Sequence, residues 1–278
     1  MKMVSAAKLR KAQDTIVRMR PYANKLKELL QRLSAGLEGE ISTPYAQQRD
    51  VKNVLVVVVT SNKGLAGSFN SSIIKVAVST IESKYGSYAK SGNLKVLCIG
   101  RKAYEYFSKR NYSVLDGNHD VFSHLSFDGV AAVADKIKDG FLYGDWDRVE
   151  LVYNEFKNIA TQNRMAEQYL PIALSAAVKN KTTSKKDTSS TTDYIYEPAK
   201  EKIIEELIPQ ILNIQLYRAV LESNAAEHGA RMFAMDNATE NAQDLLNALR
   251  LSYNKARQAA ITKEILEIVG GAEALASK

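Results

Sequence analysis

The stretch from Pro198 to Val269 most constrains what this chain can fold into. No proline follows Pro209, Gly229 is the only glycine before Gly270, and good helix formers fill the interval. We therefore expect one helix, about 90 Å long from Pro209 onward at about 1.5 Å per residue. A helix this long and thin needs a partner. Its second half carries residues at coiled-coil spacing, namely Met235, Ala238, Ala242, Leu245, Leu249, Tyr253, Ala256 and Ala260.

The first 33 residues carry a regular heptad pattern. Its members step by three or four residues and are Leu9, Ala12, Ile16, Met19, Ala23, Leu26, Leu30 and Leu33. This spacing predicts an amphipathic helix in a left-handed supercoil. Pro21 lies off the pattern and is expected to bend the helix locally, whereas Gly36 and Gly39 are expected to end it. We expect this helix to pair in antiparallel orientation with the C-terminal helix.

The net charge of +7 is concentrated in the same segment. Residues 1–33 contain nine basic side chains opposed only by Asp14 and Glu28, so this segment alone carries +7, and the charges elsewhere cancel. Such a helix suits nucleic acid, anionic lipid or an acidic protein surface. The alternative is an ordinary solvated helix face.

The middle of the chain alternates between strand and helix signals. The run Val54–Val59 is typical of a strand buried on both faces. Further strands are expected at 94–99, 112–115, 148–153 and 168–174, and helices at about 69–88, 101–110 and 128–139. This alternation predicts a mostly parallel, Rossmann-like sheet. The polar stretch Lys179–Thr192 is expected to form a mobile surface loop.

These patterns together predict an α/β protein with three parts. Residues 1–50 form an N-terminal coiled-coil helix and a linker, and residues 51–197 form a Rossmann-like α/β domain. Residues 198–278 form a C-terminal coiled-coil helix. The fold class is thus a long antiparallel coiled coil joined to an α/β domain with a mostly parallel sheet.

Composition excludes several other classes of protein. The chain has 278 residues and 45% hydrophobic content, enough for a sizeable core, yet no apolar run reaches the length of a membrane span and no secretory signal opens the sequence. The single cysteine, Cys98, excludes an internal disulfide and is interpreted as a core residue rather than a nucleophile. The histidines at 119, 124 and 228 have no metal or triad spacing, so we expect no metal and no cofactor.

One stretch invites an enzymatic interpretation. Thr60–Ser68 lies between a strand and a helix, where phosphate loops occur. No lysine follows Gly67, so the phosphate-loop order is missing, and the stretch is not Gly-x-Gly-x-x-Gly either. We interpret the glycines as permitting a tight turn and close strand–helix packing. The acidic stripe Asp236, Glu240 and Asp244 is interpreted as a solvated helix face.

Several separated blocks resemble the ATP synthase gamma subunit family. They are MKMVSAAKLRKAQ at 1–13, SNKGLAGSFN at 61–70, ARMFAMDNA at 230–238, YNKARQAAITKEI at 253–265 and EIVGGA at 267–272. The blocks stand in the family's order and span essentially the whole chain. Family members normally start several helical turns earlier, so the start of the N-terminal helix is expected to be missing here. The cysteine-bearing insertion of the chloroplast form is absent.

The resemblance implies the asymmetric central shaft of a proton-translocating ATP synthase. Such a shaft turns inside a ring of alternating alpha and beta subunits, stands on the ring of c subunits and binds the epsilon subunit. It carries rotation to the catalytic sites and does no bond chemistry itself. The resemblance implies no cofactor, no nucleic acid and no homo-oligomer. It places the chain peripherally on the cytoplasmic face of the bacterial inner membrane, with the mitochondrial inner membrane as the second choice.

The resemblance also assigns contact residues. Those matched to contacts with the alpha and beta subunits are Met1, Lys2, Arg231, Arg257, Gln258 and Thr262. Those matched to the segment that meets the c ring and epsilon are Tyr194, Tyr196 and Glu197. Each has an ordinary alternative as an ion-pair partner, plain surface or domain core.

Two other classes of function stay open from the residues alone. A Rossmann-like nucleotide-binding enzyme with a helical dimerisation hairpin would bind ATP or NAD. A nucleic-acid-binding coiled coil would use the basic first helix, although Tyr22 is the only aromatic residue there for stacking on a base. Copurification with alpha and beta subunits would separate the shaft from both.

Overall fold

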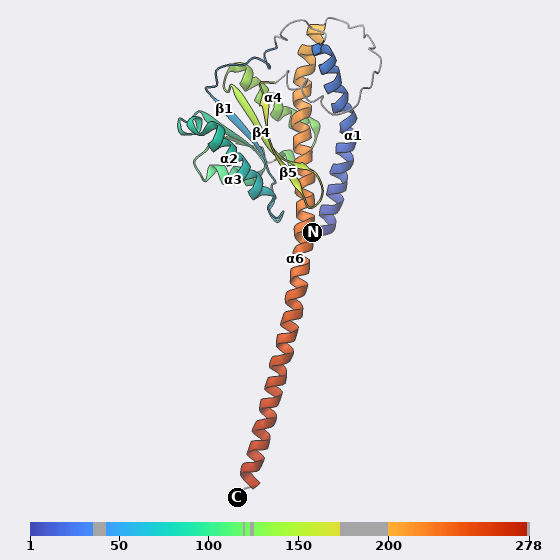
Figure 1. The fold of residues 1–278 in the computed structure, drawn as a ribbon, viewed down its shortest axis with the longest axis vertical. Coiled ribbons are helices and arrows are strands. Elements are labelled where there is room, and N and C mark those ends of the chain that lie inside the picture. The colour runs from blue at the N-terminus through green and yellow to red at the C-terminus, as the bar shows by residue number, and fades with distance from the viewer. Residues whose placement is uncertain (36–42, 119, 123–124, 173–199, 277–278) are drawn as a thin grey trace. The chain divides into compact units, whose positions relative to one another are not determined.

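The chain divides into two units, Met1–Phe233 and Ala234–Lys278. The computed structural model describes residues 1–278 except 36–42, 119, 123–124, 173–199 and 277–278. Within the described residues the first unit contains one five-stranded sheet (Figure 1). Its strands are β1 (Val54–Val59), β2 (Leu94–Ile99), β3 (Ser113–Gly117), β4 (Arg148–Phe156) and β5 (Gln162–Leu170).

The sheet is parallel except at one edge. The strand order is β3-β2-β1-β4-β5, and β1 pairs in parallel with both β2 and β4. Strand β2 pairs in parallel with β3, whereas β5 runs antiparallel to β4. The predicted mostly parallel, Rossmann-like sheet is therefore confirmed.

Helices cover both faces of this sheet. On one face lie α2 and α3, and on the other lie α4 and the first part of α6. The helices are α1 (Lys2–Ala35), α2 (Phe69–Lys90), α3 (Arg101–Ser108), α4 (Phe127–Tyr143) and α6 (Lys200–Ala276), with a 3-10 turn, η1, at Asp120–Phe122. The residues of α6 belong to both units.

The position of strand β1 between two layers of helices explains why its sequence does not alternate between apolar and polar residues. Leu55, Val57 and Val59 point into the core shared with α4 and α6. The intervening Val54, Val56 and Val58 point into the core shared with α2 and α3. Side chains alternate across a strand, so both faces demand apolar residues when both are covered by helices.

The last strand differs from the prediction. The sequence predicts a strand at 168–174, but β5 begins six residues earlier, at Gln162, and ends at Leu170. It forms a hairpin with β4 and lies at the edge of the sheet. Most residues of its first two thirds are exposed or half-buried, because an edge strand does not need an apolar sequence. Hydropathy therefore detected only the buried end, Tyr169 and Leu170.

Helix α1 pairs with the first part of α6, and the two run antiparallel (Figure 1). Leu9, Ala12 and Ile16 are buried against Leu221 and Ala225. The predicted heptad pattern of α1 is thus confirmed where its side chains are described, and the helix continues through Pro21 as expected. The small side chains at positions 12 and 225 allow the two helices to approach closely.

The seam predicted on α6 at 235–260 is not the surface that packs against α1. Every residue from Ala238 to Ala260 in that pattern is exposed, including Leu245 and Leu249 at 61% each. The residues of α6 that do pack against α1 lie earlier, at Leu221 and Ala225. The spacing at 235–260 is a real amphipathic pattern, but it is left uncovered in this chain.

Several predicted features lie outside the described residues. They are the helix-ending glycines Gly36 and Gly39, the loop Lys179–Thr192, two histidines at 119 and 124, and the contact residues Tyr194, Tyr196 and Glu197.

Candidate functional site

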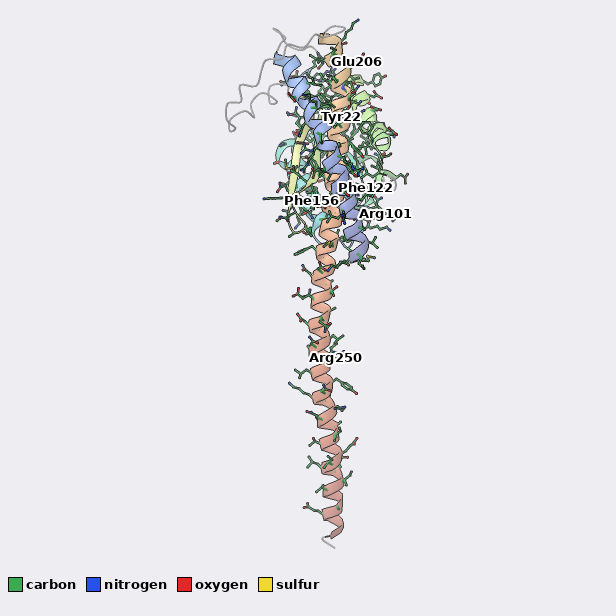
Figure 2. The ribbon with its side chains drawn as sticks, turned by 90° about the vertical axis from the view of Figure 1, so that its right-hand side faces the viewer. Tyr22, Arg101, Phe122, Phe156, Glu206 and Arg250 are labelled. Atoms are coloured by element: carbon green, nitrogen blue, oxygen red, sulfur yellow. The ribbon has the colours of Figure 1, made fainter. Side chains whose placement is uncertain are left out.

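The second unit is a helix whose surface is open beyond its first three residues, which are half-buried. Every side chain from Asn237 to Glu273 is exposed. Figure 2 shows Arg250 projecting from this helix. Arg257, Gln258 and Thr262 belong to the same exposed surface, and the Thr262 hydroxyl donates a hydrogen bond to the Gln258 carbonyl at 2.9 Å.

This surface is apolar and basic at once. Between 245 and 263 its charged residues are Arg250, Lys255, Arg257 and Lys263, all cationic. Its exposed large hydrophobic side chains are Leu245, Leu246, Leu249, Leu251, Tyr253, Ile261, Ile265, Leu266, Ile268 and Val269. A run of exposed apolar residues this long marks an interaction surface. Its charge favours a partner that offers carboxylates or carbonyl groups.

The other end of the chain is also exposed. Met1 is 76% exposed, Met3 is 85% exposed, and Lys2 lies on the surface between them. The buried residues of α1 begin at Ser5 and Leu9. The first turn of α1 is therefore available for contact with another chain.

Arg231 stands apart from the other predicted contact residues because it is buried. Its side chain is only 10% exposed, and its guanidinium lies 2.7 Å from the Glu227 carboxylate. The Arg231 Nη2 donates to the carbonyls of Lys63 and Gly64 at 3.2 and 3.3 Å, and Nε donates to Gly64 at 3.4 Å. Its Nη1 donates to Nδ1 of His228 at 3.3 Å. Arg231 therefore joins α6 to the turn at 61–68.

Burial shifts the pKa of both neighbours of Arg231 on α6. Burial raises the pKa of Glu227, and the opposing effect of Arg231 does not cancel this rise. Burial, followed by the nearby charges of Arg231 and Lys8, lowers the pKa of His228 to about 4. His228 is thus neutral near pH 7 and accepts a hydrogen bond from Arg231 through Nδ1.

The hairpin of β4 and β5 contacts the same segment of α6. The Glu222 carboxylate accepts a hydrogen bond from the Phe156 backbone N–H at 3.2 Å, and Gln162 donates to the Ala226 carbonyl at 3.1 Å. Gly229 lies beside Phe156, so that a Cβ there would stand 3.2 Å from the ring. Sequence reasoning missed this segment. The only available signal was the two acidic residues Glu222 and Glu227 among mostly small side chains.

The glycine turn at 61–68 uses its polar groups internally. The Ser61 N–H donates to the Asn70 side-chain oxygen at 3.0 Å, and the Ser61 hydroxyl donates to the Lys63 carbonyl at 2.6 Å. Gly67 has φ of 56° and Leu65 has φ of 60°, so the chain reverses direction tightly before α2 begins. This geometry matches a packing turn.

Cys98 lies in the core and is not a surface thiol. Cys98 is fully buried in the core beside α2 and α3, and burial raises the pKa of its thiol to about 12. Over the described ranges, no group of three His, Cys, Asp or Glu side chains could hold a metal ion. Within the same ranges, no helix is long and apolar enough to cross a bilayer.

Comparison with known proteins gives a consistent result. A family model described as ATP synthase matches residues 1–275. The ATP synthase gamma chain of Cytophaga hutchinsonii is 52% identical over 278 residues, covering 99% of this chain and 92% of that protein. The gamma chain of Flavobacterium johnsoniae is 53% identical over 276 residues, covering 99% and 91%.

Solved structures match the fold. A chain of the central stalk and c ring of the Tetrahymena thermophila mitochondrial ATP synthase superposes with a TM-score of 0.58 at 24% identity, covering 86% of this chain and 97% of that chain. A chain of the Euglena gracilis mitochondrial ATP synthase gives a TM-score of 0.58 at 20% identity, covering 97% and 95%. Because the family model spans nearly the whole chain and relatives about half identical match it end to end, this chain belongs to the ATP synthase gamma chain family.

Proposed function

We propose that this chain is the central rotor shaft of a proton-translocating ATP synthase, coupling rotation of the membrane c ring to conformational change at the alpha and beta catalytic sites. The observation that carries this proposal is the helix of the second unit, on which every described side chain from Asn237 to Glu273 is exposed. A bare helix with this much apolar surface is suited to lie inside a sleeve of other subunits.

The proposed contacts follow from charge and exposure. Arg257, Gln258 and Thr262 would meet the alpha–beta ring, because they lie on the open helix among basic neighbours. Met1 and Lys2 would meet an acidic surface of the beta subunit, since they lie in an exposed turn of the basic helix α1. The segment around Tyr194, Tyr196 and Glu197 would meet the c ring and epsilon, on the strength of the sequence match alone.

A shaft of this kind transmits force by shape, so it needs no catalytic residue of its own. In the proposed arrangement the chemistry belongs to the alpha and beta subunits, and this chain is held at the membrane through the complex. The complex would stand on the cytoplasmic face of the bacterial inner membrane, in line with the bacterial relatives.

Copurification tests the proposal. A tagged version of this chain, coexpressed with the alpha and beta subunits of the same organism, should recover both in a complex that hydrolyses ATP. Truncation before Gln258 should weaken recovery and coupled hydrolysis, because contacts are lost turn by turn. A matched truncation that removes only 277–278 is the control. The shaft role fails if the full chain recovers neither subunit, or if the isolated chain itself hydrolyses ATP.

A further inference from the structure

The buried guanidinium of Arg231 makes contacts that a partner-facing residue would not make. It donates to two backbone carbonyls of the turn at 61–68 and pairs with Glu227 one helical turn earlier. Its remaining terminal nitrogen donates to His228. All three nitrogens of the guanidinium therefore have hydrogen-bond partners inside the chain. Placing an arginine in this position costs desolvation, which is offset only when the hydrogen bonds are satisfied in this way.

The segment that Arg231 holds has an exposed tip. Asn62 is half-buried, whereas Lys63, Gly64 and Leu65 are exposed, and Leu65 is 65% exposed with φ of 60°. A non-glycine residue in the left-handed region is costly unless the surrounding structure holds it there. The carbonyls that accept from Arg231 belong to the two residues immediately before Leu65.

Other contacts hold the base of this turn, and one reaches its tip, where the Ser61 hydroxyl donates to the Lys63 carbonyl at 2.6 Å. Ser61 is fixed to Asn70, and Ala66 and Phe69 are buried against Ala226 of α6. The contacts with Asn70 and with Ala226 lie at the ends of the turn. Arg231 is the side chain from α6 that reaches the backbone at 63 and 64.

We propose that Arg231 is a positioning residue: it ties helix α6 to the tip of the 61–68 turn and thereby fixes the backbone that presents Lys63 and Leu65. We call this contact the Arg231 tether. The inference deepens the proposed shaft role, since it makes this contact one of the places where the sheet domain and the long helix are held to turn together.

The tether differs from the role assigned to Arg231 by family resemblance. Replacing a residue that serves only to contact the catalytic ring should leave the structure of the isolated chain unchanged beyond that residue's own surface. A tether should alter the 61–68 turn in the isolated chain, with no partner present. The two roles are therefore separable by experiment.

Two substitutions dissect the contact. Arg231→Lys keeps a cation beside Glu227 but cannot donate to both loop carbonyls and His228 at once, because an ammonium lacks the planar fork of a guanidinium. Arg231→Met removes the charge and every hydrogen bond while keeping a long side chain. Arg218→Lys is the matched control, since Arg218 also lies on α6 but pairs with Glu155 at 3.7 Å at a half-exposed site.

Hydrogen exchange on the full isolated chain is the first measurement. In Arg231→Lys, amides at 60–68 should exchange at least tenfold faster than in the parent, while those of β4 should be unchanged. Arg218→Lys should match the parent at 60–68. The pKa of His228, followed by NMR, should rise in Arg231→Met, which confirms that the guanidinium lies beside the ring. Parental exchange at 60–68 in both Arg231 variants overturns the tether.

The assembled complex gives the second measurement. With alpha, beta and the membrane sector present, Arg231→Lys should assemble normally, and its ratio of proton pumping to ATP hydrolysis should fall at least twofold. Normal exchange in the isolated variant together with lost activity in the complex would instead assign Arg231 to partner contact, against the tether. If the parent chain recovers no alpha or beta subunit, the shaft role fails, whereas the exchange result on the isolated chain still decides the tether.

Discussion

Replacing Ile16 by alanine tests the pairing of α1 with α6. Ile16 is 4% exposed and packs in a cluster with Leu9, Ala12, Leu221 and Ala225. Truncating a buried isoleucine to alanine removes apolar burial and leaves a cavity, which costs about 2–5 kcal/mol in well-packed cores. This cluster is small and lies between a helix pair, where neighbours such as the half-buried Met19 can move into the space. We therefore expect a loss of about 2–3 kcal/mol in the free energy of unfolding.

The neighbouring residue supplies the control. Val17 is 62% exposed on the same helix, so Val17→Ala should change stability by no more than about 0.5 kcal/mol. In a unit of this size about 1 kcal/mol shifts the melting temperature by about 2–4 °C. The melting temperature of the isolated chain, measured by circular dichroism, should therefore drop by about 5–10 °C for Ile16→Ala and hardly at all for Val17→Ala. Equal melting temperatures for the two variants would refute the burial of the α1 seam against Leu221 and Ala225.

Three further outcomes are expected. Arg257→Ala combined with Gln258→Ala should leave the isolated chain folded but impair assembly or coupled hydrolysis in the reconstituted complex; normal assembly and hydrolysis would remove both residues from the contact surface. Because burial raises the pKa of Cys98 to about 12, its thiol should resist a disulfide reagent at pH 8 until the chain is unfolded, and rapid labelling of the native chain would contradict its burial. His228 has its pKa lowered from 6.5 to about 4, so the unfolded chain binds the proton first and stability should fall as the pH drops from about 6.5 to 4. Urea unfolding at several pH values should show a weaker pH dependence for His228→Gln than for the parent.

The sequence predicted the seam of α1 well because that helix has one buried face. Leu9, Ala12 and Ile16 repeat at heptad spacing, and most of the other side chains of the helix are polar or basic. Only one stripe needed to be apolar, and the period alone identified it. Strand β1 was equally clear, since helices cover both of its faces and every position is apolar.

The partner seam on α6 could not be located in the same way. The first part of α6 is buried by the sheet domain through Leu212 and Leu216 and by α1 through Leu221 and Ala225. A helix covered on two sides is apolar over most of its circumference, so it shows no narrow stripe. The exposed second half does show such a stripe, and its spacing therefore looked more like a coiled coil than the true interface did.

The internal role of Arg231 was beyond the reach of sequence patterns. From the sequence alone, the arginine in ARMFAMDNA would be taken for a surface cation. In the fold it lies beside residues 63 and 64, which come about 168 positions earlier in the chain. The spacing of Glu227, His228 and Arg231 does not indicate a backbone acceptor that far away in the sequence. The family resemblance supplied a position for Arg231, whereas the structure supplied its neighbours.

Gly229 links the conformational preference of the long helix to the packing of the hairpin. A glycine inside a helix costs about 1 kcal/mol relative to alanine, so Gly229→Ala should favour the helical state. The new methyl group would lie 3.2 Å from a ring carbon of Phe156 and 3.6 Å from the Ile159 backbone, so the hairpin would have to retreat by a few tenths of an ångström. Any redesign of this helix for stiffness must therefore treat Gly229 and Phe156 as one pair, because the helix and the hairpin compete for the same space.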